Sequence, residues 1–157
     1  MLDDVGMPDT LVLSWEDLDA LVARLAERAG RDHDVVLAIT RGGLVPAGML
    51  AYLLDLREIL VAGAFFYLPD GGTHETPLIG HFPEAALLDG RRVLVVDEVW
   101  ETGETMTEVM ARVRAAGGTP VSAVLHYKPG RSRVPGAPDF HAEIVDGWVT
   151  YPYKAGA

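Results

Sequence analysis

Residues 93–105 read Val-Leu-Val-Val-Asp-Glu-Val-Trp-Glu-Thr-Gly-Glu-Thr, and this stretch decides the fold. Its first four residues are apolar and predict a buried strand of a parallel sheet. The strand ends in two carboxylates, Asp97 and Glu98, and from Glu104 onward apolar residues recur at helical spacing. A buried strand, a glycine-containing turn and a helix are therefore expected in direct succession. The free backbone amides and the dipole at such a helix start favour binding of a phosphate group.

The carboxylates beside this turn indicate that the ligand is more than a phosphate. Asp97, Glu98 and Glu101 would repel a bare phosphate group. Carboxylates do, however, accept hydrogen bonds from hydroxyl groups and bind hard divalent cations. The ligand implied by these residues is a phosphorylated sugar with a metal ion nearby.

Length and composition restrict the class of protein. The 157 residues suffice for one domain with its own core, and 49% hydrophobic and 23% charged residues are typical of a soluble globular chain. The formal net charge of −10 argues against nucleic-acid or anionic-membrane partners. There is no cysteine, no apolar run of spanning length and no secretion signal, so we expect a cytoplasmic protein.

Buried strands and helices alternate along the rest of the chain. This alternation predicts an α/β fold with a parallel sheet, right-handed crossovers and a ligand site at the carboxyl ends of the strands. Residues 68–90 contain several Gly and Pro with little periodicity, so we expect a long, lid-like loop there, with room for a short strand. The other expected strands are 11–13, 35–39, 59–67 and 120–125, and the other expected helices begin at Ser14 and after Gly43.

A second glycine-containing turn, Thr40-Arg41-Gly42-Gly43, also follows a buried strand and precedes a helix. Glycine lets backbone N–H groups face a ligand, and the arginine fork suits phosphate oxygens. The alternative is a tight turn in which Arg41 is a solvated surface residue. Because both turns leave the same edge of the sheet, we expect them to line one cleft.

The segment 93–105 resembles the signature of the type I phosphoribosyltransferases. That family has a Rossmann-like parallel sheet flanked by helices, and the resemblance implies a single domain with a small hood from residues 1–14 and 128–157. It further implies that Asp97 and Glu98 bind the ribose hydroxyls of phosphoribosyl pyrophosphate, with Asp97 also binding Mg²⁺. The implied 5′-phosphate site is the turn Glu101, Thr102, Gly103, Glu104 and Thr105.

The closest resemblance is to the xanthine-guanine phosphoribosyltransferases, whose pyrophosphate loop is similar to residues 39–48. It implies that Thr40, Arg41, Gly42 and Gly43 bind pyrophosphate and that a cis peptide joins Thr40 to Arg41. It also implies that Lys128 binds the purine 6-oxygen, that Trp148 stacks on the ring, and that the main chain at Val149 contacts the base. An ammonium suits a carbonyl oxygen, and an indole face provides stacking area.

The expected activity is transfer of phosphoribosyl to a 6-oxopurine, which yields a nucleoside 5′-monophosphate and pyrophosphate in purine salvage. Arg41 and Mg²⁺ would stabilise the leaving group, and Glu101, where the family usually has aspartate, would be the general base. Relatives are commonly dimers or tetramers, so we expect a homodimer or homotetramer.

Other functions stay open at this point. The acceptor could be a pyrimidine or an unusual base, or the chain could be a non-catalytic sensor of phosphoribosyl pyrophosphate. A dinucleotide enzyme has little support, since the Gly-x-Gly-x-x-Gly turn is absent. The five histidines lack metal-ligand spacing and are interpreted as surface or structural residues.

Overall fold

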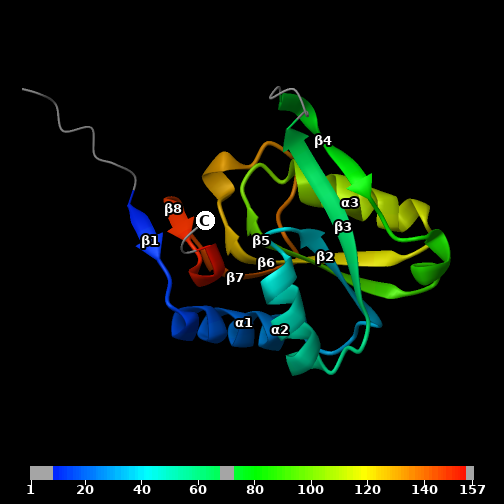
Figure 1. Cartoon of the computed structure of the whole chain (residues 1–157), viewed down its shortest axis with the longest axis horizontal. Coiled ribbons are helices and arrows are strands. Elements are labelled where there is room, and N and C mark those ends of the chain that lie inside the picture. Colours follow the sequence, from blue (N-terminus) through cyan, green and yellow to red (C-terminus); the bar gives the residue numbers. More distant parts are fainter. Residues whose placement is uncertain (1–8, 68–72, 155–157) are drawn as a thin grey trace, which may run out of the picture.

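The computed structural model of the chain describes residues 9–67 and 73–154, and its main feature is a six-stranded sheet with helices on both faces (Figure 1). The strand order is β4-β3-β2-β5-β6-β7, and all neighbours are parallel except β3 and β4. The strands of this sheet are β2 (Val35–Thr40), β3 (Ile59–Tyr67), β4 (Thr73–His81), β5 (Arg92–Trp100), β6 (Thr119–Tyr127) and β7 (Phe140–Ile144).

Side-chain alternation along the central strands divides the core into two halves. Val36, Leu94 and the alternate residues on the same side of the sheet face the layer formed by α1 (Trp15–Ala29) and α2 (Leu44–Leu54). Val35 and Val93 face α3 (Glu104–Ala115) on the opposite side. Because β2 and β5 carry apolar residues at consecutive positions, both faces of the sheet are covered, as expected for parallel strands.

Helix α1 begins as its sequence predicts. The Ser14 hydroxyl accepts a hydrogen bond from the backbone N–H of Asp17, and the Asp17 carboxylate accepts one from the backbone N–H of Ser14, which completes a capping box. No helix among residues 9–67 and 73–154 is long and apolar enough to cross a membrane.

The two ends of the chain form a separate two-stranded sheet beside the main one. Strand β1 (Thr10–Val12) pairs in parallel with β8 (Trp148–Thr150), so that Leu11 lies opposite Val149. Figure 1 shows this pair well apart from the outer edge strand β4. The N- and C-terminal segments therefore meet over one end of the domain.

Two strands differ from the sequence-based expectation. The region 68–90, expected to be a lid-like loop with at most a short strand, contains the nine-residue strand β4, which pairs antiparallel with β3. Its Gly and Pro residues hide the alternation of a strand, and the pairing is irregular between Gly63 and Ala64. Strand β7 was not foreseen either, because Asp139 and His141 flank its first residue and weaken the apolar pattern. Residues 68–72 of the expected loop lie outside the described residues.

Candidate functional site

The turn after β5 forms one wall of a cavity of about 460 Å³. Asp97 lies near the carboxyl end of β5, and the turn continues through Thr102 into the first residues of α3. All five residues of the expected phosphate site line this cavity, together with Asp97 and Arg133. The sheet therefore brings a carboxylate, a helix start and an arginine into one concave space.

Gly103 is required by its conformation and by its surroundings. Its φ of 83° is in the left-handed region, which other residues rarely adopt. A Cβ at this position would lie 2.5 Å from the Trp100 ring and 2.6 Å from a methyl group of Val134. The backbone N–H of Glu104 meets the Thr102 hydroxyl at 3.4 Å. The turn is therefore packed tightly behind the start of α3.

Asp97 is a half-buried carboxyl that faces the cavity. Its Oδ1 accepts a hydrogen bond from the backbone N–H of Glu98 at 2.7 Å, while its Oδ2 accepts none from the described residues. Burial raises the pKa of Asp97 to about 7 and the Glu98 charge adds to this rise, although the backbone hydrogen bond and Lys154 oppose it. A carboxyl in this environment would ionise readily beside a cation.

Glu98 points away from that cavity, so the two acidic residues separate. Its Oε2 accepts a hydrogen bond from the Tyr153 hydroxyl at 2.7 Å, and its Oε1 contacts the Lys154 ammonium. A Cβ on Gly42 would lie 2.6 Å from the Glu98 carboxyl carbon. Glu98 therefore packs between the second glycine turn and the carboxyl-terminal segment.

The turn Thr40–Gly43 lies directly beside the end of β5. A Cβ on Gly43 would stand 2.3 Å from the carbonyl oxygen of Val96, so only glycine permits this approach. The peptide between Thr40 and Arg41 is cis, which confirms the expectation from sequence. Arg41 is exposed, and it lines a smaller cavity of about 200 Å³ with Gly42, Tyr153 and Lys154.

The expected base-binding residues gather on the other side of the phosphate turn. Lys128 is only 4% exposed, and its Nζ lies 3.2 Å from Oε1 of Glu101 and 5.9 Å from the centre of the Trp148 ring. The Trp148 side chain is 62% exposed, whereas Val149 is buried in the core. The Lys128 side chain is therefore buried, unlike most lysines. An open indole face next to a buried ammonium offers a flat surface and one strong donor.

Glu101 joins this base region to the phosphate turn. Its Oε1 contacts the Lys128 ammonium and also the Arg131 guanidinium, each at 3.2 Å. Arg131 lies in the short 3₁₀ helix η2 (Pro129–Arg131) that follows Lys128. A carboxylate with two cations thus lies between the cavity and the indole.

Other residues beside the site carry weak sequence signals or none. Arg131 and Arg133 are both exposed at the surface, where the Arg131 guanidinium contacts Glu101 and the backbone N–H of Arg133 donates to the carbonyl of Thr102. Tyr153 and Lys154 do not belong to any of the sequence motifs described above. The best available signal was composition, because the chain contains only two lysines and both contact a carboxylate of this site.

Nothing among the described residues forms a ready-made metal site. No group of three or more His, Cys, Asp or Glu side chains in residues 9–67 and 73–154 is arranged to hold an ion. The buried histidines serve the core instead: Nε2 of His33 lies 3.0 Å from the carbonyl of Ala29, and Nδ1 of His126 lies 2.8 Å from the Tyr151 hydroxyl.

Comparisons with known proteins identify the family of this chain. The family model of the phosphoribosyl transferase domain covers residues 13–153. The xanthine-guanine phosphoribosyltransferase of Gluconobacter oxydans is 33% identical over 146 residues, which span 90% of this chain and 82% of that protein. The enzyme of the same name from Idiomarina loihiensis is 31% identical over 144 residues, spanning 90% and 84%.

Solved structures of similar proteins share this fold. A purine phosphoribosyltransferase from Pyrococcus horikoshii has a TM-score of 0.77 and 28% identity, and the match covers 95% of this chain and 96% of that one. A hypothetical protein from Neisseria gonorrhoeae, solved with bound ppGpp, has a TM-score of 0.82 and 30% identity over 96% and 92% of the two chains.

Proposed function

Since the chain belongs to the phosphoribosyl transferase domain family, we propose that it transfers the phosphoribosyl group of phosphoribosyl pyrophosphate to a 6-oxopurine. The products are a nucleoside 5′-monophosphate and pyrophosphate. The observation that carries this proposal is the position of Glu101, which belongs to the phosphate turn and also contacts Lys128 below the exposed Trp148. A sugar phosphate in the cavity would thus have its anomeric carbon directed toward a base on the indole.

The base end of the site favours a 6-oxopurine. The buried ammonium of Lys128 can donate to a ring carbonyl but cannot accept a hydrogen bond from an exocyclic amine. Trp148 would supply the stacking surface. The main chain at Val149, the next residue, would contact the edge of the ring. The names of the relatives from G. oxydans and I. loihiensis point to the same class of base.

The sugar end of the site divides its tasks among three elements. Asp97 would accept hydrogen bonds from ribose hydroxyls, and the amides at the start of α3, from Thr102 to Thr105, would bind the 5′-phosphate. The turn Thr40–Gly43 with Arg41 would bind pyrophosphate. Binding one substrate at three points would fix the direction from which the base attacks the sugar.

Mg²⁺ is proposed as the cofactor, and Asp97 is the residue that would bind it. The half-buried carboxyl with a raised pKa fits a group that normally faces a cation. A single protein carboxylate suits Mg²⁺, which retains waters and substrate oxygens as its other ligands. When bound, the ion would neutralise charge on the pyrophosphate.

In the reaction, the purine nitrogen forms a bond to the sugar C1 as the bond from C1 to the pyrophosphate oxygen breaks. The purine loses one proton, for which Glu101 is the acceptor we propose, with Lys128 and Arg131 fixing its carboxylate. Arg41 and the backbone amide of Gly42 would stabilise the charge on departing pyrophosphate, since the amide of Gly43 already donates to the carbonyl of Ile39.

The direct test is formation of nucleotide from phosphoribosyl pyrophosphate with guanine, xanthine or hypoxanthine as the acceptor, with adenine, uracil and orotate as controls. The proposal expects turnover with at least one 6-oxopurine and little with adenine. Turnover with uracil or orotate alone would instead assign another base to the site. Binding of phosphoribosyl pyrophosphate without turnover of any base would indicate a sensor.

A regulatory ligand is a second candidate, supported by the N. gonorrhoeae structure with bound ppGpp. That nucleotide combines a guanine with two diphosphate groups, and this chain offers a stacking tryptophan and two separate anion sites. Calorimetry with ppGpp in the absence of substrate tests the idea directly. Competition between ppGpp and phosphoribosyl pyrophosphate would place both ligands in one site.

We also propose that the chain acts in the cytoplasm as a homodimer or homotetramer. A cysteine-free composition suits a reducing compartment. Helix α2 has no charged residue and yet exposes Leu44, Tyr52 and Leu53, which is typical of a helix covered by another subunit. Light scattering after size exclusion measures the assembly.

A further inference from the structure

We propose that Lys154 is a second cationic ligand of pyrophosphate and that Glu98 is the residue that positions it. This inference rests on the proposed function, because it concerns the leaving group of that reaction. It assigns a role to the segment Tyr151–Lys154, whose two ends contact one residue of β5. It also gives Glu98 contacts with this segment.

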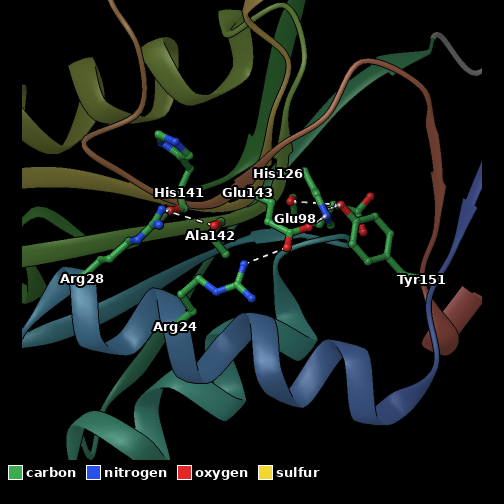
Figure 2. A network of polar contacts seen from close by, with 8 residues as sticks. All are labelled: Arg24, Arg28, Glu98, His126, His141, Ala142, Glu143 and Tyr151. Atoms are coloured by element: carbon green, nitrogen blue, oxygen red, sulfur yellow. Dashed lines mark hydrogen bonds and ion pairs between the residues drawn. The ribbon is translucent and has the colours of Figure 1, made fainter.

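Three side chains of the carboxyl-terminal segment attach to Glu98. The Tyr151 hydroxyl donates to the backbone carbonyl of Glu98 at 3.2 Å, the Tyr153 hydroxyl donates to Oε2 at 2.7 Å, and the Lys154 ammonium contacts Oε1. Figure 2 shows the Tyr151 ring beside Glu98, with its hydroxyl between Glu98 and His126. Both the backbone and the carboxylate of Glu98 thus hold this segment in place.

The same contacts bring the segment against the second glycine turn. Tyr153 also reaches the carbonyl oxygen of Gly42 at 3.4 Å, and Gly42 packs against the Glu98 carboxyl group. Arg41, Gly42, Tyr153 and Lys154 together line the cavity of about 200 Å³. Two cations from distant parts of the sequence therefore face one space next to the turn proposed to bind pyrophosphate.

The chemistry of the ammonium group allows it to serve both partners. An ammonium has three donors, so a contact with Glu98 leaves donors for phosphate oxygens. The Lys154 side chain is 48% exposed, which keeps it accessible, whereas the Glu98 side chain is 11% exposed. Moving a buried carboxylate from its cation to a sugar hydroxyl would be costly. Glu98 is therefore suited to hold Lys154 in place beside the second glycine turn.

The test uses the full chain and inorganic pyrophosphate with Mg²⁺ as the probe, measured by calorimetry. Lys154→Met should weaken pyrophosphate binding about tenfold, and Lys154→Arg should restore most of it, since a charge-assisted hydrogen bond is lost and then replaced. The KM for phosphoribosyl pyrophosphate should rise similarly, while the KM for the purine stays unchanged. The matched control is Arg112→Met, which breaks an exposed ion pair with Glu108 on α3 and should change neither value.

A second variant tests the positioning role. Glu98→Gln keeps the shape of the side chain but removes its charge, so pyrophosphate binding should weaken while Lys154 is still present. Unchanged pyrophosphate affinity in Lys154→Met, with a thermal unfolding midpoint like that of the parent, would overturn the inference. Since pyrophosphate binding needs no turnover, loss of binding in a protein that transfers to no purine would support Lys154 and refute the proposed activity.

Discussion

The ammonium of Lys128 lies 3.2 Å from Oε1 of Glu101, and this contact joins the proposed base site to the phosphate turn. Lys128 follows β6 and Glu101 follows β5, which are neighbouring parallel strands. Both side chains leave the sheet at its carboxyl edge, where they meet. The chemistry of both halves of the reaction therefore depends on one pair of adjacent strand ends.

The first prediction concerns recognition of the purine. Lys128→Met should raise the KM for a 6-oxopurine by roughly tenfold to a hundredfold, because a hydrogen bond from a charged donor is lost. The KM for phosphoribosyl pyrophosphate should change little, and discrimination against adenine should decrease. Steady-state kinetics with both substrates varied separates these effects. An unchanged purine KM would remove Lys128 from the base site.

The second prediction concerns the proton acceptor. Glu101→Gln keeps the size of the side chain but removes its basicity, so kcat should fall by roughly a hundredfold or more. Binding of phosphoribosyl pyrophosphate, measured by calorimetry, should stay within a few-fold of the parent. Glu101→Asp is the matched variant, because it keeps the carboxylate and shortens the side chain by one methylene. If Glu101→Gln retained full kcat, another group would have to accept the proton.

The third prediction concerns the phosphate turn. Gly103→Ala should lower the free energy of unfolding by roughly 1–3 kcal/mol, because alanine is strained at a φ of 83° and its Cβ would meet the Trp100 ring. Affinity for phosphoribosyl pyrophosphate should fall as well, since the start of α3 would shift. Urea denaturation gives the first quantity and calorimetry the second.

Gly48 provides the control for this substitution. It lies within α2, and a Cβ there would meet nothing within 4 Å. Gly48→Ala should therefore be neutral or stabilise the protein by up to about 1 kcal/mol, as alanine favours a helix. Equal loss of stability in the two variants would mean that the left-handed turn is not required.

The fourth prediction concerns a buried polar chain that links β6 to β5. The Tyr151 hydroxyl donates its only proton to the carbonyl of Glu98, so the Nδ1 of His126, 2.8 Å away, must carry the proton it donates to Tyr151 (Figure 2). Tyr151→Phe would leave two buried groups unsatisfied and should cost roughly 1–3 kcal/mol of unfolding free energy. An unfolding free energy of Tyr151→Phe equal to that of the parent in urea denaturation would contradict this hydrogen-bond network.

How far the sequence could predict this protein depends on whether a signal is local. The strand, turn and helix at residues 92–115 follow from consecutive apolar residues, one glycine and helical periodicity, all within a single segment. The contacts of Lys128 were predictable only through resemblance, because nothing local places that residue near Glu101. Strand β7 and the strand β4 inside the expected loop depend on pairing with distant strands. Their own residues give weak patterns.

Glu98 illustrates the limit most clearly. Its place beside Asp97 suggested a shared role, but in a strand adjacent side chains point to opposite faces. Glu98 accordingly turns toward Tyr153 and Lys154, more than fifty residues further along the chain. A sequence pattern gives the residue types at a strand end, whereas the segments that pack there decide what each side chain contacts.

The last prediction uses the pKa of Asp97, which burial raises to about 7 from an ordinary value of 3.8. Between these two pH values the folded protein binds more protons than the unfolded chain, so the free energy of unfolding contributed by this group falls as pH rises. The Asp97→Asn variant cannot ionise at this position, so its free energy of unfolding does not fall in this way as pH rises. In buffer with a chelator, the variant should therefore match the parent near pH 4 and become more stable than it by pH 7. His126, whose pKa burial lowers to about 4, titrates identically in both proteins, so its effect cancels in the difference. Urea denaturation at each pH gives that difference, and a constant value from pH 4 to 7 would mean that Asp97 ionises as an ordinary exposed carboxyl.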